Sequence, residues 1–247
     1  ENRATATKFA QRPNPSRVLR PARPYTCHVR RTALLSDVLA EFTASSSVPS
    51  ALPQASPTDD AFVHALRSLE HFIRAEYEEM TDPAVTALRL AKDPDDLALS
   101  RAVAGFAVAG WSDAVTNPEL RDPITGGDPL HAAADDQAHL SGALRLPLLH
   151  LLAESALACA RIDLAAFFLE RSGPVPDTLF GAPNPYLTVM RGLHIRVNLF
   201  QGQVGAALKL VHTAIESAHT PVESLFTSAV ACLVEGHMRR HGVNIVL

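Results

Sequence analysis

The chain has 247 residues, of which 47% are hydrophobic and only 6% are aromatic, a composition that favours closely packed helices rich in alanine and leucine. Three cysteines, Cys27, Cys159 and Cys232, are too few for a disulfide framework and fit a reducing compartment. Cys159 and Cys232 lie in apolar runs and should pack in the core. No uninterrupted run of about 18 apolar residues occurs, so the sequence predicts no membrane-spanning helix.

The amino-terminal segment is strongly basic, although the whole chain has a formal net charge of −4. Residues 1–36 carry eight basic side chains against the single acid Glu1, a net charge of +7, so the rest of the chain carries −11 (−4 minus 7). The eight basic residues are Arg3, Lys8, Arg12, Arg17, Arg20, Arg23, Arg30 and Arg31. Arg-rich, acid-poor segments are typical of mitochondrial or plastid transit peptides, and they attract polyanions. We therefore expect an extended basic arm that binds RNA through these eight residues.

Two further features precede the main body of the chain. Residues 31–42 carry apolar side chains at helical spacing, and residues 43–57 are rich in Ser, Pro and Ala. These patterns predict a short amphipathic helix followed by a linker. The arm, the short helix and the linker together make one region, residues 1–57, and a helical body follows in residues 58–247.

The first half of the body contains repeated signals for helix starts. Residues 58–60, Thr-Asp-Asp, precede an apolar stripe that runs to Met80, and they should cap the first body helix. The pairs Asp82-Pro83 and Asp93-Pro94 each place an acidic cap before a proline at the first helical position. Residues 117–140 are rich in Asn, Asp, Gly and Pro, so we expect a loop there.

The second half of the body has small residues where paired helices should turn or cross. Gly202 should end a helix in the left-handed conformation, and Pro221 should prevent a second helix from continuing. Between them, Ala207 should lie at a close crossing of two helices, with Ala214 on the same packed face. Residues 186–239 therefore predict a pair of helical hairpins.

This spacing, in units of about 35 residues, resembles the pentatricopeptide repeat and, slightly less closely, the tetratricopeptide repeat. The helix-ending glycine of the family is matched by Gly202, by Gly110 after an apolar helix, and by Ala160 after another. The packed alanine is matched by Ala207 and by Ala165. The steps between these turns exceed the repeat length, so the resemblance implies an all-α fold: an irregular α-solenoid of helical hairpins with an extended basic amino-terminal arm.

No catalytic constellation emerges from the chain. There is no phosphate-binding glycine loop and no nucleophile elbow. His237 and His241 have the spacing of half a zinc site, but no second pair with ligand spacing accompanies them, and a cationic helix end explains them. Asp135, Asp136 and His139 fall in the expected loop and should be solvated. We therefore predict a non-enzyme with no catalytic residue, no metal and no cofactor.

The repeat resemblance raises the possibility of base reading. Pentatricopeptide proteins resemble a code in which two positions of each repeat read one RNA base. In this chain those positions fall on Leu193 and Glu223. Leucine cannot form a hydrogen bond with a base edge, and the glutamate lies in an acidic body, so sequence-specific reading of RNA is disfavoured.

Three functions remain open. The favoured one is a non-catalytic subunit of an organellar ribonucleoprotein, most readily a mitochondrial ribosome in the matrix. Its repeats would dock on neighbouring proteins, its arm on ribosomal RNA, and it would make no membrane contact. The alternatives are a bacterial helical-repeat regulatory segment of a transcription activator, which leaves the basic arm unexplained, and a pentatricopeptide RNA-processing factor. The favoured function predicts that Phe226, Val230 and Leu233 pack inward and that a neighbouring subunit covers residues 237–247.

Overall fold

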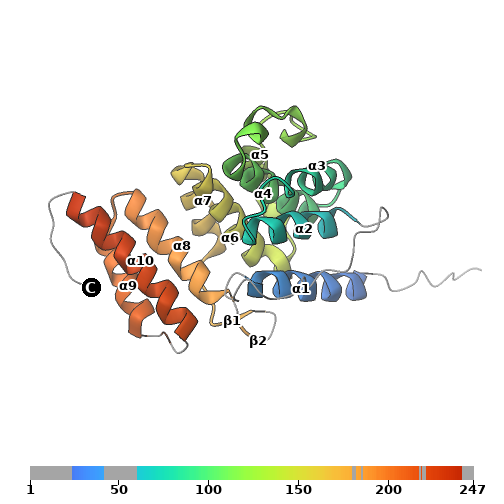
Figure 1. Cartoon of the computed structure of the whole chain (residues 1–247). Helices are drawn as coiled ribbons and strands as arrows, with labels where there is room; N and C mark the ends of the chain where they lie inside the picture. The colour runs from blue at the N-terminus through green and yellow to red at the C-terminus, as the bar shows by residue number, and fades with distance from the viewer. Residues whose placement is uncertain are drawn as a thin grey trace, which may run out of the picture.

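The computed structural model describes residues 24–41, 60–179, 182–184, 186–216, 218 and 221–240. Within these ranges the chain is almost wholly α-helical, with one antiparallel pair of two-residue strands, which confirms the all-α prediction. The helices, in chain order, are α1 (Pro24–Glu41), α2 (Ala61–Ile73), α3 (Thr81–Leu90), α4 (Pro94–Gly110), α5 (Pro129–Asp136), α6 (Gly142–Ala158), α7 (Ile162–Ser172), α8 (Leu187–Phe200), α9 (Val204–Glu216) and α10 (Pro221–Arg240) (Figure 1). The smaller elements are the 3-10 helices η1 (Ser112–Thr116), η2 (Pro118–Leu120) and η3 (Gln137–His139) and the strands β1 (Thr178–Leu179) and β2 (Ala182–Pro183). Among the helices described, none has the length and hydrophobicity needed to cross a membrane.

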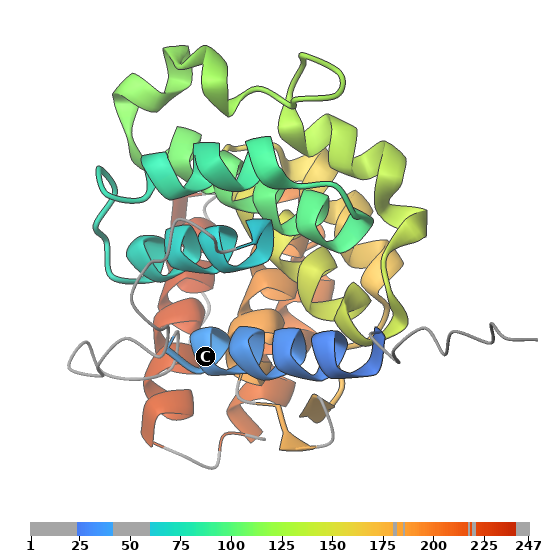
Figure 2. The same ribbon diagram turned by 90° about the vertical axis from the view of Figure 1, so that its right-hand side faces the viewer.

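Helix α1 is longer than the helix expected at residues 31–42, and it begins at Pro24, a residue that suits the first helical position. Leu35, Val38 and Leu39 are fully buried and belong to the same apolar cluster as residues of α2. Figure 2 shows α1 lying across the edge of the helices that follow it. Helix α1 therefore packs as part of the body and not with a separate arm, while the predicted linker, residues 43–57, lies outside the described residues.

Aspartate caps begin two of the early helices as predicted. Asp60 and Asp93 each accept a hydrogen bond from the backbone N–H three residues later, at 3.1 and 3.0 Å, and Pro94 takes the first position of α4. Helix α3 begins at Thr81, so Asp82 lies within its first turn and does not cap it. The predicted start of α3 was therefore displaced by a residue or two, which is the usual precision of a cap signal.

Helices α2, α6 and α8 end on the same backbone conformation. The left-handed residues are Ala75, Ala160 and Gly202, with φ of 59°, 57° and 76°. In each case the next N–H bonds to a carbonyl five residues earlier, at 2.9, 2.8 and 2.8 Å, which is the Schellman arrangement. The same motif therefore closes the first helix of three described pairs, α2–α3, α6–α7 and α8–α9.

Gly110 does not occupy the turn position that the repeat resemblance assigned to it. Helix α4 runs through Gly110 and ends when the Trp111 N–H bonds to the Ala107 carbonyl at 3.0 Å. A Cβ on Gly110 would lie 2.7 Å from Cδ1 of Tyr77, so the missing side chain permits close contact between α4 and the segment after α2. The first hairpin turn lies instead at Ala75.

Residues 117–140 were predicted to form a loop, and this prediction is wrong because they contain α5, η2 and η3. A buried arginine on α4 orders the segment. Arg101 is 1% exposed, and its guanidinium donates to Asp122 at 2.6 Å and to Asp136 at 2.8 Å. Burial alone would raise the pKa of Asp122, but hydrogen bonds from Arg101 and from Thr125 hold it below its ordinary value.

The apolar interior of the described chain forms two clusters, and α8 contributes to both. The first cluster contains residues from α1 to α8, including the fully buried Ala165. The second joins the other face of α8 to α9 and α10, and it contains Ala207 and Ala214, which are 0% and 7% exposed. Pro221 is the first residue of α10, so it separates α9 from the next helix. Figure 1 shows α7 to α10 side by side along one end of the molecule.

Candidate functional site

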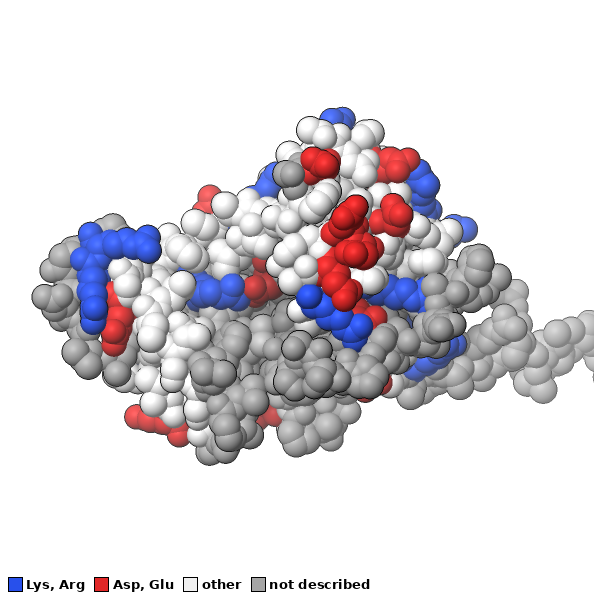
Figure 3. All heavy atoms as spheres, viewed as in Figure 1, with Lys and Arg blue, Asp and Glu red and all other residues white. Residues whose placement is uncertain are grey.

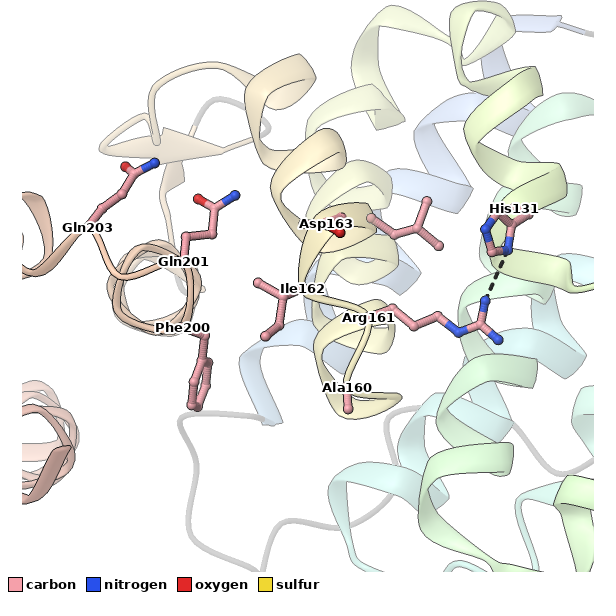
Figure 4. A pocket seen from close by; sticks show the side chains of 9 residues that line it. His131, Ala160, Arg161, Ile162, Asp163, Phe200, Gln201 and Gln203 are labelled. Carbon is pink, nitrogen blue, oxygen red and sulfur yellow. Dashed lines mark hydrogen bonds between the residues drawn. The ribbon is translucent and has the colours of Figure 1, made fainter. Parts of the chain in front are cut away.

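Two adjacent hollows lie along the turns of consecutive hairpins. The larger, of about 640 Å³, is lined from α5, from the α6–α7 turn and from the α8–α9 turn. The smaller, of about 320 Å³, lies between α4, the start of α5 and the end of α6. Ala160 and Arg161 line both, so we treat the two hollows as one surface, the turn groove. Its larger part is lined by His131, Ala160, Arg161, Ile162, Asp163, Leu164, Phe200, Gln201 and Gln203 (Figure 4).

The backbone positions the two sides of this groove in the same way. The Arg161 N–H bonds to the Ala156 carbonyl, and the Gln203 N–H to the Asn198 carbonyl, each at 2.8 Å. Because both helices end in the same left-handed motif, the two turns present equivalent residues to the space between the hairpins. The two sides of the groove are therefore similar because the left-handed backbone motif occurs in both turns, although the side chains of the two turns differ.

Arg161 is the cation of the groove, and its charge is compensated. It forms an ion pair with Asp128, and its NH1 donates to Nδ1 of His131 at 3.0 Å, so this imidazole nitrogen acts as an acceptor. Asp128 also accepts from the Leu130 N–H at 2.7 Å and thereby caps α5. In Figure 4, Arg161 points towards His131, away from the α8–α9 turn.

The opposite side of the groove is apolar with polar margins. Phe200, the last residue of α8, is 45% exposed, an unusual degree for a phenylalanine, and Ile162 points towards this end of α8 (Figure 4). Gln201 and Gln203 are exposed and offer amide donors and acceptors beside this apolar surface. The groove therefore combines an apolar patch, neutral amides and the exposed carboxylate of Asp163, a mixture that suits an extended peptide better than an anionic ligand.

The groove thiol does not have the environment of a nucleophile. Cys159 is partly buried, and its Sγ donates to the Gly105 carbonyl at 3.2 Å. Burial raises the pKa of this thiol, while Arg161 opposes the rise, so the unreactive thiol form dominates at neutral pH. In the described ranges, no group of three or more His, Cys, Asp or Glu side chains is arranged to hold a metal ion.

The basic residues predicted to bind RNA divide into two sets. Six of them, Arg3, Lys8, Arg12, Arg17, Arg20 and Arg23, lie outside the described residues, and Arg30 is exposed on α1. Arg31 departs from the prediction, because its side chain is only 12% exposed and pairs with Asp93 at 3.1 Å and with Asp96 at 2.9 Å. Burial and the nearby Asp93 carboxyl raise the pKa of Asp96 to about 7, even though Arg31 opposes this rise. Arg31 thus ties α1 to the start of α4.

Leu193, the residue at a base-reading position of the repeat code, is 1% exposed and packs in the interior. Near the carboxyl end, Val230 is 7% exposed as expected, but Leu233 is 44% exposed and Cys232 is exposed, so the inward packing predicted for those two is wrong. Helix α10 packs on α8 and α9 through fewer of its apolar side chains than predicted, namely Val230, Ala231, Val234 and Met238. The side chain of Phe226 and residues 241–247 lie outside the described part of the chain.

Sequence reasoning missed the groove residues His131, Phe200, Gln201 and Gln203. They form no motif, and they come together only because distant turns lie side by side. The signal that could have found part of the set is an aromatic residue two positions before a helix-ending glycine, as Phe200 is before Gly202. Comparison of the chain with protein-family models, with curated proteins and with solved structures found no match.

Proposed function

We propose that this chain is a non-catalytic scaffold, an irregular solenoid of helical hairpins that binds an extended segment of a partner protein in the turn groove. The observation that carries the proposal is the shared groove of two hairpins whose first helices end in the same left-handed motif, at Ala160 in one and at Gly202 in the other. Stacked hairpins of this kind create extended surfaces along their repeated elements, and such surfaces are suited to elongated partners.

The chemistry of the groove supports a partly apolar peptide without acidic side chains. Asp128 already compensates Arg161, Asp163 adds an exposed carboxylate, and the exposed apolar surface centres on Phe200. The exposed amides of Gln201 and Gln203 can bond to the backbone of an extended chain, while Phe200 and Ile162 receive an apolar side chain. On the face seen in Figure 3, uncharged described surface at this end lies between a group of basic side chains at the far left and further charged side chains nearer the centre.

The test is selection of peptides on the full chain from a random library displayed on phage. Peptides with one large apolar residue and no acidic side chain should be enriched. The substitution Phe200→Glu should weaken their binding by about tenfold or more, because it places a charge against the apolar anchor. Leu90→Glu is the matched control, since Leu90 is exposed to a similar extent, 43%, on α3 away from the groove. Equal binding to both variants, or enrichment of acidic peptides, would contradict the proposal.

A second function rests on the amino-terminal charge. Residues 1–30 carry seven basic side chains against Glu1, a net charge of +6 (seven minus one), after Arg31 is set aside as internally paired. We propose that this segment binds structured RNA, so that the scaffold serves in an organellar ribonucleoprotein such as the mitochondrial ribosome. Basic segments of this kind gain affinity by releasing counterions from phosphates.

The measurement is binding of the full chain to a ribosomal RNA hairpin at several salt concentrations. If four of the basic residues meet phosphates of the duplex, log K should fall with log salt at a slope of about −3.6. Deletion of residues 1–23 should remove most of this dependence, whereas Arg31→Gln should leave it unchanged. A flat salt dependence would rule out the RNA proposal. It would leave a protein-binding regulatory segment, such as that of a transcription activator, as the alternative.

A further inference from the structure

Helix α8 is the element that holds the carboxyl-terminal helices on the rest of the molecule. One face of α8 contributes Val189, Met190 and Leu193 to the first apolar cluster, while the other contributes Ile195 and Leu199 to the second. Helices α9 and α10 pack on α8, and α8 in turn packs on α6 and α7. Whatever changes the contact between α6 and α8 therefore changes the attachment of all three carboxyl-terminal helices.

A pair of histidines crosses this contact. Nε2 of His150 on α6 lies 3.3 Å from Nε2 of His194 on α8. Nδ1 of His150 lies 3.1 Å from the Leu146 carbonyl, which can only accept, so Nδ1 carries the proton. Nε2 of His150 must then accept from the Nε2–H of His194. The contact therefore needs a neutral His150 with its proton on Nδ1, and a His194 that carries a proton on Nε2.

Protonation of His150 is unfavourable at this contact. His150 is 0% exposed, so a cation there would lose its hydration, and a proton on its Nε2 would face the N–H of His194. Burial lowers the pKa of His150 to about 4, with His194 as the neighbouring charge that lowers it further, and burial also lowers the pKa of His194. A histidine whose folded pKa is depressed stabilises the closed state above its ordinary pKa of 6.5 and destabilises it as the pH falls below that value.

The charged groups beside the pair do not offset this effect. Glu154 and Arg196 lie farther along the same two helices and form their own ion pair at 2.6 Å. Tyr186, at the start of α8, is fully buried, and its pKa is raised by burial and by the Glu154 charge. Among the described residues of α4 and α7, which also pack on α6, no charged side chain contributes to the pKa shift of either histidine.

We propose that the His150–His194 pair is an acid-sensitive latch between α6 and α8, and that acidification opens this contact and loosens α8, α9 and α10 together. With a pKa of 6.5 in the open state and about 4 in the closed state, His150 alone raises the opening constant roughly 30-fold at pH 5 relative to pH 7.5. The latch adds regulation to the scaffold, and it does not depend on the identity of the partner.

The experiment is residue-resolved amide hydrogen exchange on the full chain at pH 7.5 and pH 5.0, corrected for the intrinsic exchange rates. Protection in α8, α9 and α10 should fall roughly 30-fold at pH 5.0, while protection in α2 and α4 stays within about threefold. His150→Leu should abolish most of this difference. His212→Gln, on an exposed position of α9, is the matched control and should retain it.

Nitrogen NMR of the two imidazoles gives a second test that requires no substitution. His150 should remain neutral, with the proton on Nδ1, down to at least pH 5, and His194 should carry its proton on Nε2. Titration of His150 near pH 6.5, or a proton on its Nε2 at neutral pH, overturns the proposal. A loss of protection that is equal in α2, α4 and α8, or a His150→Leu variant that keeps the full pH dependence, overturns it as well.

Discussion

Replacement of Arg101 by methionine should destabilise the chain by roughly 3 kcal/mol. Methionine keeps most of the buried volume of the arginine stem but removes the partner of Asp122, which is 1% exposed. Breaking a buried ion pair in this way typically costs about 3–5 kcal/mol. The lower end applies here because Asp122 keeps hydrogen bonds from Thr125 N and Thr125 Oγ1, at 2.8 and 3.0 Å. Asp136 is half exposed, so in the variant water can replace its lost ion pair with Arg101.

The assay is urea unfolding followed by the fluorescence of Trp111, the single tryptophan, which packs on the first apolar cluster. Arg89→Met is the matched control, because the Arg89–Glu119 pair is exposed, and it should change the free energy of unfolding by less than about 1 kcal/mol. The wild-type Asp122 has a lowered pKa and stabilises the fold above its unfolded pKa. The difference between Arg101→Met and wild type should therefore shrink as the pH falls below about 4. An Arg101→Met chain within 1 kcal/mol of wild type at neutral pH would refute the reasoning.

Three further outcomes follow from packing and exposure. Gly105→Ala should cost about 1–3 kcal/mol, because the new Cβ would overlap the hydroxyl of Ser155, which donates to a backbone carbonyl at 2.7 Å. Ala207→Leu should cost about 1–3 kcal/mol in the same urea assay, because Ala207 is fully buried among α8, α9 and α10. Cys232 is exposed and should react rapidly with a thiol reagent, whereas Cys159 should react much more slowly because burial raises its pKa.

Each of these measurements has a matched control. Gly142→Ala places its Cβ where no atom lies within 4 Å and should not destabilise α6. Ala206→Leu, on the exposed side of α9, should change stability by less than about 0.5 kcal/mol. The thiol measurement uses a Cys27→Ser background, so that only two cysteines are counted. Equal losses for Ala206→Leu and Ala207→Leu would contradict the packing described for α9.

The sequence predicted the elements whose signals are local. The caps at Asp60 and Asp93 and the helix ends at Ala160 and Gly202 depend on neighbouring backbone atoms, so a short stretch of residues suffices to identify them. Ala75 ends α2 in the same way, yet it was missed because alanine has no intrinsic preference for the left-handed conformation and carried no distinctive signal here.

The features that could not be predicted depend on partners distant in the chain. Arg101 lies on an apolar helix, and its burial depends on the counter-charge of Asp122, 21 residues away. The turn groove needs His131, Arg161 and Phe200 to lie on one surface, and no local pattern specifies how hairpins stack. Arg31 was assigned to the arm from its charge alone, whereas its partners lie at the start of α4.

The turn groove takes its residues from both sides of the α6–α8 contact. Arg161 follows α6, Phe200 is the last residue of α8, and Gln203 directly precedes α9. A peptide that bridges these turns prefers the closed arrangement, and a proton on His150 prefers the open one. Thermodynamic linkage then requires that each ligand lower the affinity of the other by the same factor. Protonation of His150 would therefore weaken peptide binding without contact between the two sites. The affinity of the peptide, measured across pH, would report whether the α6–α8 contact is closed or open.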